Sequence, residues 1–239
     1  MTGLRSEERG VSELIGYVLA FSIVVASVGA VYAGGLGAAM EFQQDERETN
    51  AERAFVALAE SMNDLQRGDA PARNGEIRLA GGTLSMQDGP TVSVTVDSDN
   101  GSWVYEAAVD ALAYSVGETN VAYVTGGVVR EDGGAGSIAA APPFACTEER
   151  ALVSLVLLDA GDATTRAGQG SVLIEARRSS TSVEYANTSV ESVTIDIDEN
   201  SEAWQRHLIE GEWTASDDGV ECDADRVVVR VTKVRIDFL

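Results

Sequence analysis

The sequence predicts an α+β protein, with a long N-terminal membrane or amphipathic α-helix followed by an antiparallel β-sandwich or barrel-like domain. Two observations lead to this prediction. Residues 14–40 contain no formal charge, and a helix needs only about 20 apolar residues to cross a bilayer. After residue 75, short segments alternate apolar and polar side chains or form apolar runs, and Gly-rich turns separate them, as in antiparallel β proteins.

The apolar helix contains a ridge of small residues at every fourth position: Ser22, Ala26, Ala30, Gly34 and Ala38. Small residues let helices approach closely in lipid, where no hydrophobic effect drives their association. Membrane helices are rich in Ala and Gly in any case, so the spacing is either a packing surface or a consequence of composition. We favour a packing surface.

The helical pattern continues beyond the apolar segment. Between residues 41 and 67, apolar side chains recur at steps of three and four residues, and charges occupy the other side. Gly68 and Pro71 then form a stop signal. The apolar positions are Ala51, Ala54, Phe55, Leu58, Met62 and Leu65.

Local patterns place the β-strands and turns. Gly81-Gly82 lies between two short strand-like segments, which predicts a hairpin turn. Residues 131–143 are rich in Gly, Ala and Pro and predict an exposed loop, and residues 199–210 predict a short helix. Further strands are predicted over residues 91–96, 103–116, 121–124, 128–130, 151–158, 172–176, 182–185, 189–197 and 226–238.

The charge balance is strongly acidic, with 39 Asp and Glu against 17 Lys and Arg, for a net charge of −22. Nucleic acid is therefore excluded as a partner, because no basic stripe offsets the repulsion. Lys233 is the only lysine. Such a surface is typical of proteins that stay soluble at very high salt, where a Debye length of about 3 Å screens like charges.

The sequence indicates no enzyme. His207, the only histidine, lies on the predicted short helix, and no nucleophile, phosphate-binding or dinucleotide motif is present. We expect no cofactor, and one His with two Cys cannot complete a structural zinc site. Three tryptophans could line a carbohydrate surface, but core packing is the commoner role: Trp103, Trp204 and Trp213.

Two further features bear on the compartment. Cys146 and Cys222 lie among acidic, turn-like residues, which predicts exposed cysteines and one disulfide in an oxidising environment; two buried free thiols are the alternative. Two sequons begin at Asn100 and Asn187. They agree with export, although such short patterns arise often by chance.

The junction before the apolar helix reads Arg9-Gly10-Val11-Ser12-Glu13-Leu14-Ile15-Gly16. It resembles the N-terminus of archaeal type IV pilins, especially haloarchaeal ones, in which a basic and a small residue precede Val-Ser-Pro-Val-Ile-Gly. The stretch from residue 9 to residue 55 is also similar to a poorly characterised haloarchaeal group of pilin-like membrane proteins. The resemblance covers about the first quarter of the chain.

This resemblance implies that a membrane prepilin peptidase cleaves between Gly10 and Val11 and recognises Arg9. It also implies a leader peptide (1–10) and a transmembrane or pilin-core helix (11–40). The periodicity of the residues that follow predicts an amphipathic extension (41–70) and an extracellular β-rich domain (71–239). The implied partners are the peptidase, other pilin-like subunits, an assembly ATPase and its membrane platform, together with membrane lipid.

One residue departs from the pilin pattern, because Glu13 stands where the haloarchaeal pilins have Pro. Glu13 could neutralise the Val11 amine of its own chain or of a neighbour, or it could be an acid favoured by the helix dipole near the N-terminus. The departure leaves open whether the chain is a major pilin, a minor pilin or only pilin-like.

We therefore expect a single-pass protein of the cell membrane with its C-terminal domain outside, assembling by helix packing into a surface filament or acting as a minor subunit or pseudopilin. Two alternatives are an uncleaved anchor that holds a binding domain outside, and a secreted domain released by signal peptidase after Val31-Tyr32-Ala33. The first residue of the mature chain separates the three: Val11, Met1 or Thr2, and Gly34.

Overall fold

The computed structural model describes residues 7–162 and 164–239, and within them the side chains of all but residues 7–13 and 35–41. The chain divides into two compact units, Met1–Arg47 and Glu48–Leu239. The last helical turns, from Glu48 to Arg67, therefore belong to the same unit as the β-strands.

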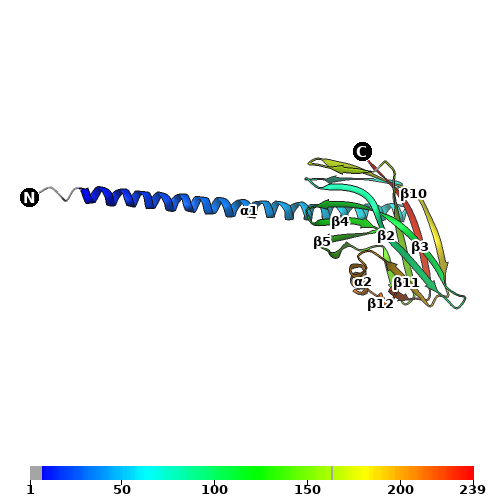
Figure 1. Cartoon of the computed structure of the whole chain (residues 1–239). Coiled ribbons are helices and arrows are strands. Elements are labelled where there is room, and N and C mark those ends of the chain that lie inside the picture. Colours follow the sequence, from blue (N-terminus) through cyan, green and yellow to red (C-terminus); the bar gives the residue numbers. More distant parts are fainter. Residues whose placement is uncertain (1–6, 163) are drawn as a thin grey trace, which may run out of the picture. The chain divides into compact units, whose positions relative to one another are not determined.

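Within the described residues, the elements are one long helix, eleven strands, a short helix and three final strands, in this order (Figure 1). Their bounds are α1 Glu7–Arg67, β1 Ala72–Arg78, β2 Thr83–Asp97, β3 Trp103–Val116, β4 Thr119–Val124, β5 Gly127–Asp132, β6 Ala135–Ala140, β7 Phe144–Thr147, β8 Arg150–Ala160, β9 Thr165–Ala167, β10 Ser171–Asn187, β11 Ser192–Ile197, α2 Ser201–Ile209, β12 Thr214–Ser216, β13 Gly219–Asp223 and β14 Val227–Phe238.

Helix α1 ends where the sequence predicts. Gly68 has a φ of +91°, a left-handed conformation that suits glycine after a helix. The backbone N–H of Gly68 donates to the carbonyl of Asp64 at 3.1 Å, and that of Asp69 donates to the same carbonyl at 3.0 Å. Arg178 adds a hydrogen bond from Nη1 to the carbonyl of Leu65 at 3.0 Å, which places a cation at the negative end of the helix dipole.

The strands form one 14-stranded sheet with the path β1-β10-β14-β8-β3-β2-β11-β13-β12, and the ladder is not closed into a ring. A mostly β domain after one N-terminal apolar helix confirms the coarser form of the predicted fold. The purely antiparallel expectation is wrong, because β14 and β8 run parallel from Val227↔Ala151 to Ile236↔Ala160. The continuous apolar run of β8 fits this pairing, since parallel strands are buried on both faces.

Two local predictions are also wrong. Gly81-Gly82 does form a turn, but β1 pairs with β10 and not with β2. The backbone N–H groups of Leu79 and Gly81 donate to the carbonyls of Gly170 and Gly168, so the end of β1 and the turn lie against the segment just before β10. The predicted loop 131–143 contains β6, which pairs with β5. Gly133 and Gly134, both with positive φ, supply the tight turn of that hairpin.

Two hydrophobic cores lie on opposite faces of the long strands. The first core joins the last turns of α1 to one face of the sheet; its helical members are Ala51, Phe55, Leu58, Ala59, Met62 and Leu65. Burying Phe55, Leu58, Met62 and Leu65 contributes about 1.5–3 kcal/mol each before conformational entropy is subtracted. A typical domain is stable by only about 5–15 kcal/mol in total, so we expect these helical turns to contribute substantially to the stability of the β domain.

The second core lies between two arms of the sheet. Arm A consists of β10, β14, β8 and β7, and arm B consists of β3, β2, β11, β13 and β12. Side chains from both arms meet in one cluster, including Val229 and Val231 from arm A and Val94 and Ile195 from arm B. Trp204 of α2 also packs into this core, and α2 lies beside β11 and β12 (Figure 1).

Candidate functional site

The candidate site begins with the exposed part of α1. Among the described residues, one helix is long and apolar enough to cross a membrane: its candidate span is Leu14–Gly34, 21 residues, with none of its surface buried within the chain. At 1.5 Å per residue this span is about 31 Å long, which matches the hydrocarbon core of a bilayer. An exposed helix of this kind followed by a β domain is compatible with a membrane-anchored protein.

The small-residue ridge lies on this helix. Ser22, Ala26, Ala30 and Gly34 are exposed, whereas the side chain of Ala38 lies outside the described residues. The Ser22 hydroxyl donates to the carbonyl of Val18 at 2.7 Å, so it brings no unsatisfied polar group into lipid. Because four residues exceed one helical turn, the ridge rotates about 40° per step. The small residues therefore follow a spiral and do not all face one neighbour.

The cleavage junction lies at the edge of what the structure describes. Arg9, Gly10 and Val11 belong to helix α1, but their side chains, like that of Glu13, lie outside the described residues. Residues 1–6 lie outside altogether. Cleavage after Gly10 and the two readings of Glu13 stay predictions from the sequence.

An arginine clamp attaches the helix to the β domain. Arg130 of β5 donates from Nη2 to Glu48 at 2.9 Å, from Nη1 to Glu52 at 3.1 Å and from Nη2 to Asp132 at 3.0 Å. The Arg130 side chain is 20% exposed and that of Glu48 is 10% exposed. The hydrogen bond from Arg130, with a second from Thr119, holds the pKa of Asp132 below its usual value. The same pairing with Asp132 raises the pKa of Arg130.

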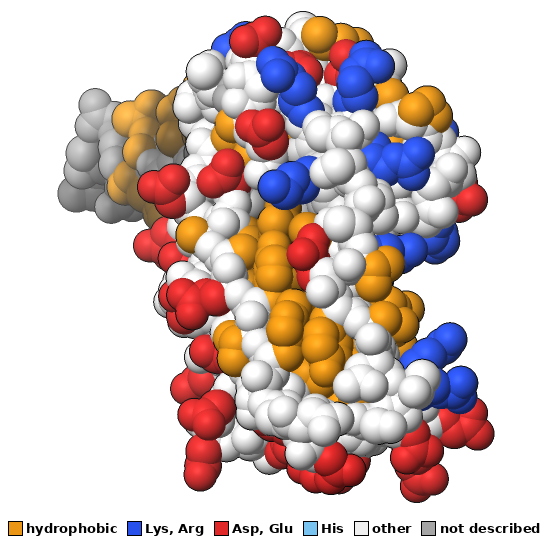
Figure 2. Space-filling view, turned by 90° about the vertical axis from the view of Figure 1, so that its right-hand side faces the viewer, with side chains coloured by type: hydrophobic (Ala, Val, Ile, Leu, Met, Phe, Trp, Pro, Cys, Tyr) orange, Lys and Arg blue, Asp and Glu red, His pale blue; other side chains and the backbone are white. Residues whose placement is uncertain are grey.

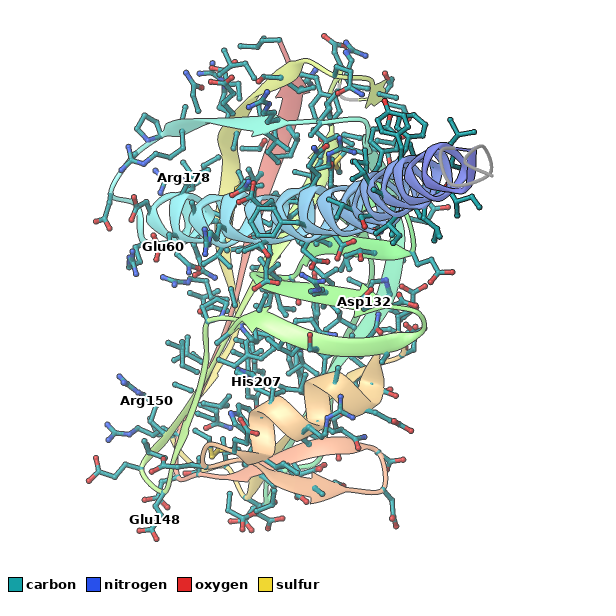
Figure 3. The ribbon with its side chains drawn as sticks, turned by 90° about the vertical axis from the view of Figure 1, so that its left-hand side faces the viewer. Glu60, Asp132, Glu148, Arg150, Arg178 and His207 are labelled. Carbon is teal, nitrogen blue, oxygen red and sulfur yellow. A yellow bond between two sulfur atoms is a disulfide. The ribbon has the colours of Figure 1, made fainter. Side chains whose placement is uncertain are left out.

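Sequence reasoning missed this clamp. A signal was present, because Glu48 and Glu52 are one helical turn apart and Arg130 follows the apolar pair Val128-Val129. Only the fold shows that the two elements meet. Figure 3 shows the last turns of α1 lying over the strands, with Asp132 in the β5–β6 hairpin beside them. The clamp and the buried apolar stripe together attach the helix to the domain.

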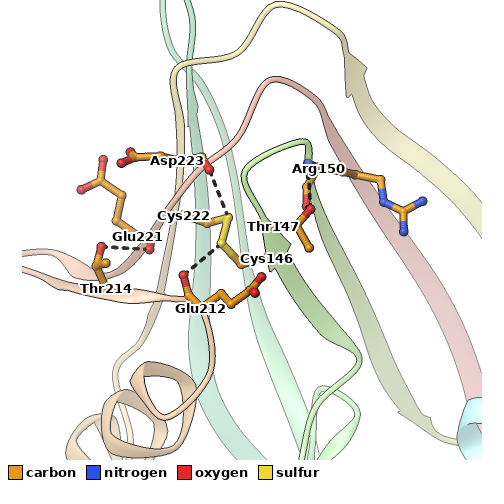
Figure 4. The surroundings of a disulfide bond; sticks show 8 residues. All are labelled: Cys146, Thr147, Arg150, Glu212, Thr214, Glu221, Cys222 and Asp223. Atoms are coloured by element: carbon orange, nitrogen blue, oxygen red, sulfur yellow. Dashed lines mark hydrogen bonds between the residues drawn. A yellow bond between two sulfur atoms is a disulfide. The ribbon is translucent and has the colours of Figure 1, made fainter.

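The two cysteines form a disulfide between β7 and β13, with Cys146 and Cys222 separated by 76 residues in sequence (Figure 4). The expectation that both are exposed is wrong for Cys222, which is 1% exposed, because its strand closes over the second core. The Cys146 sulfur lies 3.2 Å from the carbonyl oxygen of Glu212. The disulfide thus joins arm A to arm B along one side of the second core.

The histidine and the three tryptophans that the sequence singled out lie on α2, at the second core and at its edge. His207 is half-buried on α2, while Trp204 and Trp213 are buried in the second core and Trp103 is half-buried at its edge. A hollow of about 640 Å³ beside the disulfide is lined largely by acids, among them Glu148 and Asp223. The described residues contain no group of three or more His, Cys, Asp or Glu placed to hold a metal ion.

These features define a class of protein: one exposed apolar helix, followed by a β domain that encloses the last turns of the same helix. The chain matches a family of unknown function (DUF7289) over residues 9–237, and it belongs to this family. The match covers the junction at Arg9, the helix and almost all of the β domain. No curated protein and no solved structure matches the chain.

Proposed function

We propose that this chain is a type IV pilin-like surface subunit. It is inserted in the membrane, processed by a prepilin peptidase after Gly10, and assembled by packing of its N-terminal helix into a filament or as a minor subunit or pseudopilin. The observation that carries the proposal is the Arg9-Gly10-Val11-Ser12-Glu13 junction directly before a fully exposed apolar helix. We propose a structural role and not an enzymatic one.

The disulfide supports the external placement of the β domain in this proposal. Cys146 and Cys222 are bonded, and disulfides persist in oxidising compartments. The arginines favour neither orientation, because Arg5 and Arg9 precede the apolar span and Arg47 and Arg53 follow it.

Cleavage changes what the helix can do. The leader carries charges that oppose movement of the N-terminus into the bilayer, since a charged side chain in the hydrocarbon core costs several kcal/mol. Without the leader, the helix can exchange lipid neighbours for other helices. The spiral course of the ridge from Ser22 to Gly34 offers small residues in several directions, which suits a helix with several neighbours more than a two-helix dimer.

The external domain would then be presented on the surface of the assembly. The two arms that face each other across the second core support our proposal that the domain is an open β-sandwich. Partners in this proposal are the peptidase, further pilin-like subunits, an assembly ATPase and its membrane platform. Membrane lipid surrounds the helix before assembly.

The test is mass spectrometry of the N-terminal peptide from native membranes, with Gly10→Leu compared against Gly29→Leu as the matched control, since a side chain at Gly29 meets no atom within 4 Å. We expect Val11 as the first residue in the wild type and in Gly29→Leu, and an uncleaved chain in Gly10→Leu. A wild-type chain that keeps its first ten residues contradicts the proposal and favours a plain anchor, and a chain that begins at Gly34 favours a secreted domain. Surface filaments that are sheared from cells and contain this chain would distinguish a pilin from a subunit that forms no filament.

A further inference from the structure

The disulfide joins arm A to arm B along one side of the second core. Along the opposite side, stacked aromatic rings join the two arms and no disulfide is present among the described residues. Within the described residues, β3 and β8 share a single registered pair, Asp110 with Leu158, so the first half of β3 has a free edge. The last part of β10 pairs with β14 on one side, while β1 pairs only with its first part, up to Arg177. These two free edges approach each other, and Trp103 of β3 stacks on Tyr185 of β10 with ring centroids 4.7 Å apart.

This aromatic seam is partly open to solvent. Trp103, Tyr105 and Tyr185 are half-buried and pack against the second core, and the rings of Trp103 and Tyr105 stack at 6.2 Å. Figure 2 shows hydrophobic side chains gathered in a strip on the face where β3 and β10 lie. Free strand edges beside exposed apolar side chains invite pairing with other chains unless something covers them.

Both sequons lie at the two strands of this seam. Asn100 is three residues after the end of β2 and three before Trp103, in the turn that leads into β3. Asn187 is the last residue of β10, two positions after Tyr185. The stack of Trp103 on Tyr185 therefore brings the two acceptor motifs to the same part of the domain.

The Asn100 amide is fully available. Asn100 is exposed in a turn closed by the Gly101 N–H, which donates to the Ser98 carbonyl at 2.9 Å. Gly101 has a φ of +114°, and a side chain placed there would meet no atom within 4 Å. The hydroxyl of Ser102, the third residue of the sequon, is also exposed and donates to the carboxylate of Asp97. A modifying enzyme could therefore reach the Asn100 side chain without a clash with the rest of the domain.

The Asn187 amide, in contrast, is engaged at both ends. Its Nδ2 donates to the Tyr185 hydroxyl at 3.0 Å. Its Oδ1 accepts from the backbone N–H of Thr188 at 2.7 Å and from that of Ser189 at 3.1 Å. Asn187 is also half-buried. In the folded domain the Nδ2 therefore points at the Tyr185 hydroxyl and is partly covered, so an enzyme could reach it only if this hydrogen bond opened.

We propose that Asn100, and not Asn187, is the N-glycosylation acceptor of the folded domain. The donor is an oligosaccharide linked through phosphate or diphosphate to a polyprenyl lipid, and a membrane oligosaccharyltransferase carries out the transfer. The Asn100 Nδ2 forms a bond to the anomeric carbon and passes one proton to a base of the transferase. The bond from the anomeric carbon to the phosphate oxygen breaks, and the lipid phosphate leaves with the electron pair.

A glycan at Asn100 would lie at the start of the free edge of β3, where it would hinder pairing of another chain with that edge. This inference rests on the proposed function only in requiring that the β domain is exported. It does not depend on cleavage after Gly10 or on filament formation. The two ideas can therefore fail separately.

The test uses the full chain in an archaeal host that N-glycosylates exported proteins, with wild type, Asn100→Gln and the matched control Asn187→Gln. Glycopeptide mass spectrometry and thiol alkylation are performed on the same membranes, so that the Cys146–Cys222 disulfide reports export. We expect a glycan on the Asn100 peptide, its complete loss in Asn100→Gln, and unchanged occupancy in Asn187→Gln.

Two outcomes overturn the inference alone. The first is a bare Asn100 in a chain whose disulfide is formed, and the second is a glycan on Asn187. A chain that stays inside the cell with two free thiols overturns both this inference and the proposed surface role. Because Asn100 is exposed and makes no hydrogen bond among the described residues, its replacement by Gln leaves the fold intact, and disulfide formation in that variant checks this point.

Discussion

Replacing Phe55 by Ala tests whether the last turns of α1 belong to the β domain. Phe55 is 0% exposed in the first core, whereas Phe42, on the same helix, is 63% exposed. Truncating a buried Phe removes its transfer free energy and leaves a cavity, which together cost about 3–5 kcal/mol. For a domain of 150–250 residues each kcal/mol lowers the melting temperature by about 2–4 °C. We therefore expect Phe55→Ala to lower it by about 6–20 °C.

The assay is thermal and urea unfolding of a soluble chain that starts at Phe42 and so contains the whole unit Glu48–Leu239. Phe42→Ala is the control, since surface substitutions usually change stability by less than about 0.5 kcal/mol. The urea m-values of the two variants should agree, because the surface exposed on unfolding is nearly the same. Equal effects of the two substitutions, or a loss below about 1 kcal/mol for Phe55→Ala, would refute the conclusion that these helical turns complete the core.

Four further changes have expected outcomes that the same unfolding assay measures. Replacing Cys146 and Cys222 by Ala should cost about 4 kcal/mol, because the disulfide closes a loop of 76 residues; an unchanged midpoint would contradict this. Arg130→Gln should cost about 1.5–3 kcal/mol, since two helix carboxylates lose a charged hydrogen-bond partner, and a neutral effect would show that the clamp adds no stability. Tyr123→Phe should be neutral or stabilising, because its buried hydroxyl has no partner among the described residues; a loss above 1 kcal/mol would reveal one. Asp110→Asn should stabilise at pH 7, because burial and two neighbouring aspartates raise the pKa of Asp110. Protonation of Asp110 removes the buried negative charge and its repulsion from the neighbouring aspartates. The extra stability of Asp110→Asn over the wild type should therefore shrink as the pH falls through the raised pKa; a stability difference that does not change with pH would show that this charge is not its cause.

Local sequence patterns correctly predicted the elements whose position depends on residues close together in the chain. The apolar stripe from Ala51 to Leu65 predicted the helical face that the first core buries, and Gly68 predicted the end of the helix. The apolar run at residues 151–158 and the alternation at 226–238 predicted β8 and β14. In each case a period of 3.6 or 2 residues reports on one element alone.

Pairing between distant segments could not be read in this way. The sequence indicated a hairpin at Gly81-Gly82, yet β1 pairs with β10, whose partner residues lie about 100 positions further along the chain. It treated residues 131–143 as a loop, although β6 is held there by β5. Periodicity states which face of a strand is buried, but it does not name the strand that lies beside it.

The sequence by itself determined that an apolar helix long enough for a bilayer follows a short polar segment, and that a β-rich, strongly acidic domain comes after it. Only the tertiary structure decided that the helix supplies part of that domain's core, that Arg130 clamps it, and that one side of the arm pair is closed by Cys146–Cys222 and the other by Trp103 on Tyr185. The physical reason is how far apart in the chain the interacting residues are. Helix length and amphipathicity depend on residues a few positions apart, whereas cores, ion pairs and disulfides join residues that the chain alone keeps far apart and only the fold brings together.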